Sequence, residues 1–562
     1  AASFIVNDVA NFRIGNAGTN SSTQNNVNVT ISSPIAATGA IEIYGADVAA
    51  NGNLTTSTAS VLLLKGTGNV SIGAGVSATR RAITTAGGPI TLWSNADASG
   101  LGAVSINNYV DVSSGAGAIL IAGSATSSES SPTGYATAGT GDWGVAIGSS
   151  AVATDSVKLT TTSGDITVRG KIQSTNGIGI GVAVVSGANI TSTTGAISID
   201  GTSYQPTGTT QGHATYLNLS GGYTTTITTG ATAKTAISIS GVVTSTATGS
   251  STNAYGVIAW AAAPGGLNIK ATGTDGDINI SGVAATNTTD ALALNATSIY
   301  ATSGDITLNA GSQRVAFGQQ GANIIGGAVS AANHTGAVNI CAGNVAFSSG
   351  STQTIRTSGA LVIEPCSGSF TQAQVWSSAD VTMAAGSVRF GRTGNTAGIT
   401  VSVPLSVAGN VDVIGGAVTY NGTGVTTSNN GNITVSASGA YSGLAAFNAN
   451  GNVSITAASY AGTGAITSAG TGGIAVFATA GDVNTGANMT ANTSSAAPIM
   501  LSASANILLG NNLTSAGGPI TLGSDSDAAN AGGILTSAGT LIASNGGNVT
   551  LSGGTDITTG FA

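Results

Sequence analysis

Charged residues are the scarcest class in this chain. Lys, Arg, Asp and Glu make up 6% of the 562 residues, against about 25% in ordinary globular proteins. The net charge is −8 and the 13 Lys and Arg are scattered, whereas nucleic-acid binding needs clustered basic residues. The densest basic point is the pair Arg80 and Arg81, which a solvated turn explains. We therefore expect no nucleic acid partner.

Long apolar runs are also missing. No window approaches the roughly 18 consecutive apolar residues of a transmembrane helix, so the sequence predicts no transmembrane segment. Disordered chains usually combine low hydrophobicity with high net charge. Here 41% of the residues are hydrophobic, and the aliphatic residues alternate with polar ones. The chain should therefore fold, with a surface of Ser, Thr, Asn and Gly.

A five-residue pattern recurs throughout the chain: Gly, any residue, aliphatic, polar, aliphatic. The most regular copies begin at Gly409, Gly431, Gly451 and Gly472, at intervals of 22, 20 and 21 residues. A longer segment, AGGPITL at 86–92, returns at 516–522. Further copies of the pattern begin at Gly68, Gly88, Gly164, Gly195, Gly276 and Gly304. The chain is therefore built from repeats.

The alternation in each copy has a period of two, which predicts a short strand with one buried face. Gly and Asn turn signals bound these strands. Such a strand cannot bury its inner face alone, but stacked repeats bury a continuous aliphatic column, at about 1.5–3 kcal/mol for each side chain. We expect two such columns, formed by Val411, Ile433, Val453 and Ile474 and by Val413, Val435, Ile455 and Val476.

The predicted fold is all-β: a right-handed parallel β-helix, or β-solenoid, with about 20–22 residues per coil. Glycine-rich repeats without helical periodicity disfavour helices, and β-sandwiches need longer strands and more aromatic cores. Residues 1–562 are expected to form a single array, with 1–31 as a candidate N-terminal cap region. Two stretches that break the rhythm, 124–143 and 203–216, are predicted to be loops leaving the solenoid.

The repeats resemble those of a known group of proteins. The Gly-x-Ile-Thr-Leu copies, the two AGGPITL segments and the segment GALVIEP at 359–365 resemble filamentous-haemagglutinin-type exoproteins. These are large bacterial adhesins of two-partner secretion and related autotransporter passengers, and the resemblance covers nearly the whole chain. It implies a right-handed β-helix, export across two bacterial membranes, a secreted or extracellular place at the bacterial cell surface, and adhesion or matrix formation.

Candidate catalytic groups are sparse. A β-helix can carry a carbohydrate-acting enzyme, but a glycosidase needs two carboxyl groups that face one bond. The acidic residues are spread thinly, and Asp165, Asp277 and Asp305 follow glycine in turns, where turn capping explains them. The GxGxxG match at 139–144 is expected by chance in a chain with 85 glycines. We predict no enzyme, no catalytic residue and no cofactor.

Metal sites are equally sparse. His213 and His334 are isolated from each other and from the cysteines, so the sequence predicts no zinc site. Asp525, Asp527 and Asn530 form an oxygen-rich segment that is a weak calcium candidate, because the full calcium-binding loop pattern is missing and a solvated loop is the favoured explanation.

The two cysteines are a disulfide candidate. Cys341 and Cys366 lie 25 residues apart, about one coil plus a short insertion, so they could face each other on adjacent coils. A disulfide would suit an oxidising exterior. The sequence leaves this disulfide and two free thiols equally open.

The predicted function is a secreted bacterial surface protein, structural or adhesive, that forms an elongated β-helical rod. Its partners would be other copies of itself and host or other cell surfaces. The alternative is a self-assembling extracellular filament, sheath or surface-lattice subunit, because a surface with few charges lacks the repulsion that keeps proteins apart. A carbohydrate-acting β-helix enzyme is the third hypothesis.

Overall fold

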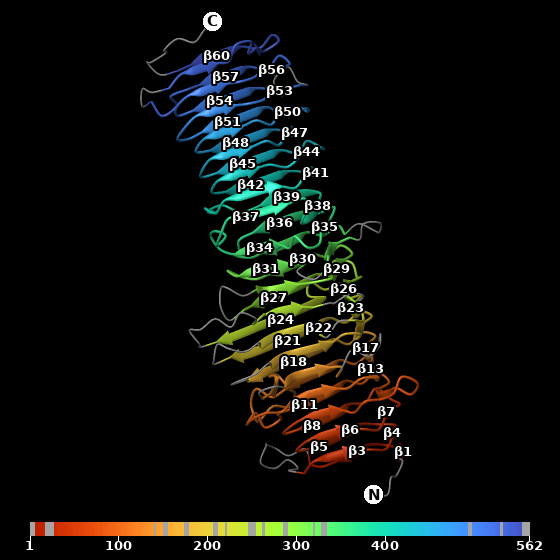
Figure 1. Ribbon diagram of the computed structural model, residues 1–562. Coiled ribbons are helices and arrows are strands. Elements are labelled where there is room, and N and C mark those ends of the chain that lie inside the picture. The colour runs from red at the N-terminus through yellow and green to blue at the C-terminus, as the bar shows by residue number, and fades with distance from the viewer. Residues whose placement is uncertain are drawn as a thin grey trace. The chain divides into compact units, whose positions relative to one another are not determined.

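The computed structural model confirms an all-β chain of stacked parallel strands, a parallel β-helix (Figure 1). The residues that it describes are 6–16, 27–139, 142–149, 155–173, 179–205, 212–219, 222–245, 254–260, 265–284, 290–318, 321–327, 334–492, 497–528 and 532–553. The chain divides into two compact units, Ala1–Gly336 and Ala337–Ala562, called unit 1 and unit 2 below.

A coil of unit 1 carries three strands in chain order, one on each of three faces, and its strands pair in parallel with those of the next coil. The coil that begins with β13 has a fourth strand, because both β14 and β15 lie on face 2 and pair with β18. Face 1 holds β1 (Val6–Val9), β4 (Ile35–Ala37), β7 (Leu54–Thr56), β10 (Arg81–Thr84), β13 (Val110–Gly115), β17 (Val157–Thr161), β20 (Asn189–Ser192), β23 (Thr225–Thr229), β26 (Leu267–Ala271), β29 (Thr297–Ala301) and β32 (Ile324–Gly326). Face 2 holds β2 (Phe12–Ile14), β5 (Ile41–Gly45), β8 (Leu62–Gly66), β11 (Ile90–Ser94), β14 (Ile119–Gly123), β15 (Ala136–Ala138), β18 (Ile166–Gln173), β21 (Ile197–Gln205), β24 (Ile237–Ser245), β27 (Ile278–Val283) and β30 (Ile306–Asn309). Face 3 holds β3 (Val29–Ile31), β6 (Val48–Ala50), β9 (Val70–Ile72), β12 (Val104–Ile106), β16 (Trp143–Ile147), β19 (Gly179–Val185), β22 (Gly212–Leu219), β25 (Val257–Ala259), β28 (Asp290–Leu294) and β31 (Arg314–Phe317).

Unit 2 has the same three-faced coil. Face 2 holds β33 (Val338–Cys341), β36 (Ala360–Glu364), β39 (Ser387–Phe390), β42 (Val411–Gly415), β45 (Ile433–Ala437), β48 (Val453–Ala457), β51 (Ile474–Ala478), β54 (Ile499–Ala503), β57 (Ile520–Gly523) and β60 (Val549–Ser552). Face 3 holds β34 (Asn344–Phe347), β37 (Gln374–Ser377), β40 (Ile399–Ser402), β43 (Val418–Tyr420), β46 (Tyr441–Gly443), β49 (Tyr460–Gly462), β52 (Val483–Thr485), β55 (Ile507–Leu509) and β58 (Ile534–Thr536). Face 1 holds β35 (Gln353–Arg356), β38 (Val381–Ala384), β41 (Leu405–Val407), β44 (Val425–Thr427), β47 (Phe447–Ala449), β50 (Ile466–Ser468), β53 (Met489–Ala491), β56 (Leu513–Ser515) and β59 (Ile542–Ala543).

The core of unit 2 contains the two predicted columns. Val411 pairs with Ile433, Ile433 with Val453 and Val453 with Ile474. The second column, two residues further along each strand, follows the same register from Val413 to Val476. All eight side chains are at most 1% exposed. The prediction of these columns is confirmed, and burial of aliphatic side chains in register stabilises the stack.

Glycine begins the repeat because two coils approach each other closely there. A Cβ atom added to Gly164 would lie 1.9 Å from the carbonyl oxygen of Gly117, and one added to Gly431 would lie 2.2 Å from that of Gly409. These separations are far shorter than any real contact of a Cβ atom. The repeat therefore needs glycine for space between stacked coils.

Coil length varies more than the repeat suggests. In unit 2 the step between paired residues on face 2 is shortest from Ile433 to Val453 and longest from Ile520 to Val549. In unit 1 the step from Ile119 to Ile166 is more than twice as long as that from Ile41 to Leu62. The coil length predicted from the sequence therefore describes only part of the array. Stacking fixes the register of the strands and leaves the connections free to lengthen.

The two stretches that were predicted to be loops, 124–143 and 203–216, lie in unit 1. Of 124–143, residues 136–138 form β15, which pairs with the second half of β18, and 140–141 lie outside the described residues. Of 203–216, residues 203–205 end β21 and 212–216 begin β22, while 206–211 lie outside the described residues. Of 1–31, the described part holds β1, β2 and β3, which pair with strands of the next coil.

Four strands of face 2, β18, β21, β24 and β27, extend past the corner of the coil and build an extra layer of unit 1. In Figure 1, β21 and β24 are the longest arrows and project to the left. We call this layer the flange: residues 170–173, 201–205, 241–245 and 282–284 on one side, and 179–181, 212–214 and 254–256 on the other. The two sides nearly touch, because a Cβ on Gly201 would lie 2.0 Å from the Ala214 carbonyl oxygen. Ala214, Val243 and Ala254 form a small core of their own there.

Candidate functional site

The acidic turn residues that the sequence singled out hold successive coils together. The Asp165 carboxylate accepts a hydrogen bond from the backbone N–H of Ala196 at 2.8 Å, and Asp277 accepts one from that of Asp305 at 2.8 Å. Each bond joins neighbouring coils of unit 1. These contacts account for Asp165 and Asp277 as structural residues, since each carboxylate satisfies a backbone donor at the corner of the coil.

Asparagine takes the same role in unit 2. The side-chain oxygen of Asn410 accepts from the N–H of Asn432 at 2.9 Å, and that of Asn432 accepts from Asn452 at 2.7 Å. The Asn452 side chain continues the series to the N–H of Gly473 at 2.9 Å. The Asn and Asp residues of the repeat therefore form ladders that run from coil to coil along its corner.

His213 is the most unusual polar residue of the flange. It is 5% exposed, and its Nδ1 atom is buried without a hydrogen-bond partner. Its ring stacks on Tyr255 at 5.3 Å and meets Tyr216 edge-on at 5.2 Å. Burial lowers the pKa of His213 to about 4 and raises the pKa of Tyr216 to about 12. Sequence reasoning dismissed His213 because no second metal ligand lies near it in the chain.

The neighbouring coils place an ion pair beside this aromatic group. Asp290 is 2% exposed and pairs with Arg314, its partner in register on β31. Burial raises the pKa of Asp290, and Arg314 opposes that shift. The charge of Asp290 in turn adds to burial in raising the pKa of Tyr255. The sequence carried no signal for this cluster, because insertions of different lengths separate its members.

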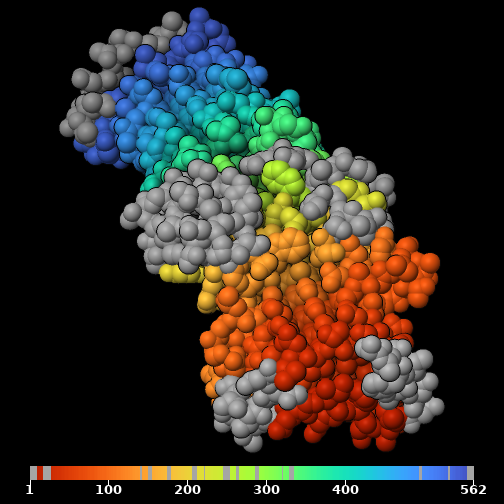
Figure 2. All heavy atoms as spheres, turned by 60° about the horizontal axis from the view of Figure 1, so that its bottom comes forward, coloured from red at the N-terminus to blue at the C-terminus, as the bar shows by residue number. Residues whose placement is uncertain are grey.

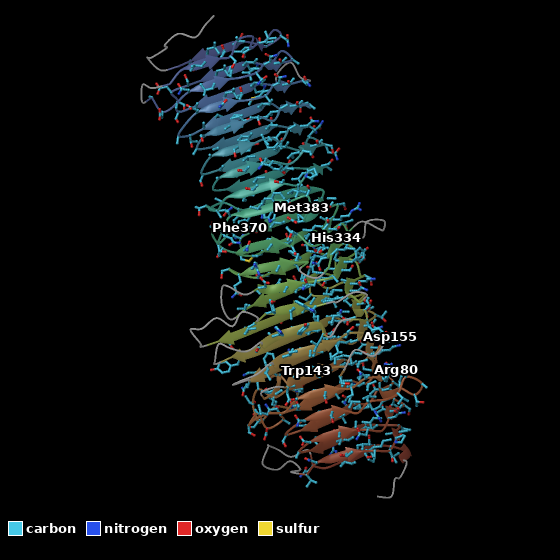
Figure 3. All side chains as sticks on the ribbon, in the orientation of Figure 1. Arg80, Trp143, Asp155, His334, Phe370 and Met383 are labelled. Carbon is cyan, nitrogen blue, oxygen red and sulfur yellow. A yellow bond between two sulfur atoms is a disulfide. The ribbon has the colours of Figure 1, made fainter. Side chains whose placement is uncertain are left out.

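A second small group of charges lies on face 1 of unit 1, where Arg80 and Asp155 project from neighbouring parts of the stack (Figure 3). Arg80 pairs with Asp111, and the Arg81 guanidinium donates to the carbonyl oxygen of Gly73 at 2.6 Å. Burial alone would raise the pKa of Asp155, but Asn189, Lys158 and Arg80 together lower it. The contacts of Arg80, Arg81 and Asp155 therefore join connecting segments to the strands of face 1.

The remaining candidates are His334, the acidic segment at 525–530 and the glycine motif at 139–144. His334 is fully buried, with Nδ1 2.7 Å from the Ala301 carbonyl oxygen. Asp525 lies in a left-handed turn, Asp527 follows it, and Asn530 lies outside the described residues. Within the described ranges, no group of three His, Cys, Asp or Glu side chains could hold a metal ion. Residues 140–141 of the glycine motif are likewise outside these ranges.

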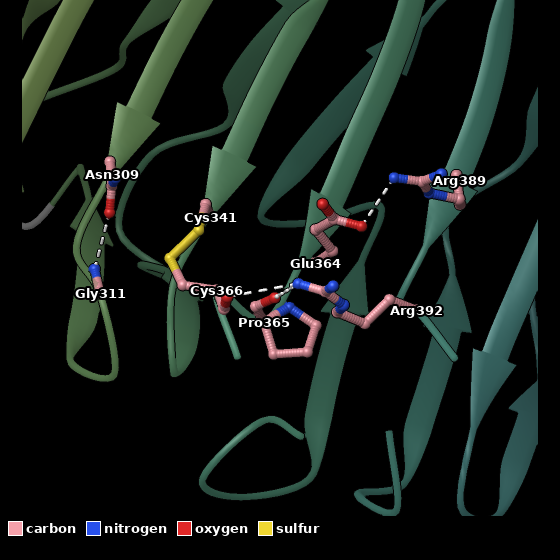
Figure 4. Close-up of a disulfide and its surroundings, with 8 residues drawn as sticks. All are labelled: Asn309, Gly311, Cys341, Glu364, Pro365, Cys366, Arg389 and Arg392. Carbon is pink, nitrogen blue, oxygen red and sulfur yellow. Dashed lines mark hydrogen bonds and ion pairs between the residues drawn. A yellow bond between two sulfur atoms is a disulfide. The ribbon is translucent and has the colours of Figure 1, made fainter. Parts of the chain in front are cut away.

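Cys341 and Cys366 form a disulfide in unit 2, with Cα atoms 4.9 Å apart (Figure 4). Cys341 is the last residue of β33, and Cys366 follows β36 by two residues. The bond therefore joins two adjacent coils at the end of face 2. The carboxylate of Glu364 pairs with Arg389, and Arg392 donates to the carbonyl oxygen of Cys366 at 3.2 Å.

The most extensive feature of both units is a set of outward-facing polar columns. On face 1 of unit 2 each strand from β41 to β56 presents one such side chain, in register with the next. The column consists of Ser406, Thr426, Asn448, Thr467, Thr490 and Thr514. Face 1 of unit 1 carries a similar column, formed by Thr55, Thr84, Ser113, Thr160, Thr191 and Thr228.

These columns lie on a surface that is almost without charge in unit 2. Residues 413–562 contain four charged residues, Asp482, Asp525, Asp527 and Asp556, and no Lys, Arg or His. Unit 1 is more charged, with ten of the 13 Lys and Arg. Its first coils, coloured red for their low residue numbers, face the viewer in Figure 2. An extended face of hydroxyl and amide groups with few ions can contact another surface at little cost in ion desolvation. We treat these columns as the candidate functional surface.

No family model matches the chain, and no significant similarity to a curated protein or to a solved structure was found. None of the described segments is a helix of the length and apolar character needed to cross a membrane.

Proposed function

We propose that the chain is a secreted structural or adhesive protein of the bacterial cell surface. The observation that carries the proposal is the pair of in-register polar columns on face 1, which offer a repeated array of hydroxyl and amide groups over successive coils. Many weak contacts of this kind act together when the array meets another repetitive surface, so that affinity grows with the number of coils engaged.

Two further observations support this proposal. The repeats resemble those of filamentous-haemagglutinin-type adhesins, which implies export and a surface location. The disulfide between Cys341 and Cys366 fits an oxidising exterior, because disulfides persist there and are rare in the reducing cytosol.

Location and adhesion are tested separately. Immunogold labelling of intact source cells should place the chain on the outer surface, and labelling that requires permeabilised cells would refute the surface location. Beads coated with the purified chain should bind cells or abiotic surfaces. A variant with Thr426, Thr467 and Thr490 changed to Lys should bind less, and equal binding by the variant would remove face 1 of unit 2 from the proposal.

Self-assembly is a second function that a specific observation favours. The surface of unit 2 has so few charges over 413–562 that two copies meet with little electrostatic repulsion. Analytical ultracentrifugation over a range of protein and salt concentrations tests it. Growth of oligomers with concentration is the expected result, and a monomer under all conditions would leave adhesion alone.

A further inference from the structure

A regular coil interface of unit 2 has a backbone ladder on each of its three faces. Between the coils of β45 and β48, for example, face 2 pairs Ile433 with Val453, face 3 pairs Tyr441 with Tyr460, and face 1 pairs β47 with β50. Three ladders hold such an interface by many independent hydrogen bonds. We call the interface between the coils of β45 and β48 the reference interface.

Two successive interfaces of unit 2 depart from this arrangement, because β34 and β37 on face 3, and β38 and β41 on face 1, belong to different sheets. The first of them lies between the coil of β33, β34 and β35 and the coil of β36, β37 and β38, and we call it the seam. Face 2 and face 1 keep their ladders there, through β33 with β36 and β35 with β38. On face 3, β34 and β37 belong to different sheets. Within residues 334–407, which the structure describes throughout, the seam therefore has two backbone ladders where the reference interface has three.

Side chains replace the missing ladder. The side-chain oxygen of Gln374 accepts a hydrogen bond from the N–H of Val345 at 2.9 Å, and the indole N–H of Trp376 donates to the carbonyl oxygen of Val345 at 3.3 Å. Gln374 is 1% exposed and Trp376 is fully buried. Because Val345 is itself buried, loss of these two contacts would leave its backbone groups unsatisfied.

The disulfide crosses this same seam. Cys341 ends β33 on one coil, and Cys366 lies in the connection between β36 and β37 on the next. That connection is fastened on its other side as well, because Asn395 of the following coil accepts from the N–H of Phe370 at 3.2 Å. The covalent link therefore lies at the coil interface of unit 2 where β34 and β37 lack a ladder.

We infer that the Cys341–Cys366 disulfide is a redox-sensitive lock on the seam, and that reducing it lets the edges of β34 and β37 separate. The reductant is a dithiol: it is oxidised to its own disulfide, while each cysteine of the chain gains one hydrogen. Both cysteines are half-buried, so the bond can be reached from the surface. The freed edges would carry unpaired backbone groups of the kind that pair with added strands.

Native-state hydrogen exchange followed by mass spectrometry tests this lock. Reduction should speed exchange in peptides that cover 343–347 and 371–377 by about tenfold or more, because local opening determines the exchange rate. Peptides that cover 433–437 and 453–457, at the reference interface, should not change. Unchanged exchange at the seam, or an equal increase at both interfaces, would overturn the inference.

Two variants control this experiment. Replacing both Cys341 and Cys366 with Ser should reproduce the fast exchange at the seam, and adding the dithiol should then have no further effect. Gln374→Met removes the side-chain bridge at similar volume. It should speed exchange of the Val345 N–H by about tenfold more in the reduced protein than in the oxidised one. An equal effect in both states would show that the disulfide and the seam are independent.

Discussion

The two units contain the same coil and differ in what surrounds it. Both have three faces of parallel strands. The inner columns of both contain Ile, Leu and Val with almost no exposure, and those of unit 2 also contain aromatic side chains such as Tyr420 and Phe447. Unit 1 contains ten of the 13 Lys and Arg and both histidines. Its face 2 also has much longer steps, such as that from Ile119 to Ile166, than the longest step of unit 2, from Ile520 to Val549. The stack therefore depends on its inner columns, and the connections carry the differences.

Unit 1 uses its longer connections to build local structure. The flange adds a small apolar core beside the coil and buries His213 and Ser203 there. Unit 2 contains no histidine, and side chains of Asn410, Asn432 and Asn452 join its successive coils. Unit 1 is therefore expected to respond to pH, and unit 2 to respond to changes that disturb stacking alone.

The largest expected effect comes from the shared core. Ile199 in unit 1 and Ile455 in unit 2 are both fully buried, so replacing either with Ala should destabilise its own unit by about 2–5 kcal/mol. Urea unfolding followed by hydrogen exchange would measure the loss in each unit. A loss below about 1 kcal/mol in one unit only would show that the two cores are not equivalent.

The next largest effect is expected from acid, which should destabilise unit 1 and leave unit 2 as the control. The pKa of His213 is lowered to about 4 in the folded protein from its usual 6.5, so protonation favours the unfolded state. The stability contributed by neutral His213 is complete above pH 6.5 and is lost as the pH falls toward 4, by about 3 kcal/mol in total.

Hydrogen exchange of residues 212–219 at pH 7.5 and pH 4.5 would measure this loss. His213→Phe keeps a ring against Tyr255 and removes the titration, so it should abolish the difference at these residues. The interface of β45 and β48 in unit 2 contains no histidine and serves as the internal control. If the variant kept the full acid sensitivity of residues 212–219, His213 would not be its cause.

Glycine substitutions should act in both units. Gly164→Ala and Gly431→Ala each place a Cβ within 2.2 Å of a backbone carbonyl oxygen, so each should cost about 1–3 kcal/mol by forcing two coils apart. Gly398→Ala is the matched control, because its nearest neighbour would lie at 3.5 Å. Thermal unfolding of the three variants would decide, and equal stability of all three would contradict the close-approach explanation.

The smallest expected effect is the loss of one rung of the Asn ladder. Asn432→Ala removes the acceptor for the N–H of Asn452 and should cost about 0.5–1.5 kcal/mol. Asn484→Ala, at an exposed outward position on β52, should change stability less. Unfolding midpoints of the two variants measure the difference, and a larger effect at Asn484 would contradict a structural role for the ladder.

The coil could be predicted from the sequence, because the alternation of apolar and polar residues and the glycine at each turn are local signals. The register of Val411, Ile433, Val453 and Ile474 follows from their equal place after each glycine. The flange could not be predicted, because His213 meets Tyr255, and Asp290 meets Arg314, only through the stacking of coils that are separated by insertions of unequal length. Gln374 and Trp376 gave no signal either, since their role depends on a ladder that is absent from one interface.

The stacking register is the claim on which the rest of the account depends, and engineered cysteine pairs test it most directly. Thr434 and Ser454 are partners on adjacent coils, and Ala475 is the partner of Ser454 one coil further along. Neighbouring parallel strands lie about 4.8 Å apart, within reach of a disulfide, whereas two coils span about 9.6 Å, beyond it. Oxidation should therefore cross-link Thr434→Cys with Ser454→Cys, and leave Thr434→Cys with Ala475→Cys unlinked, as mapped by mass spectrometry. Efficient linking of the second pair, or failure of the first, would contradict the solenoid.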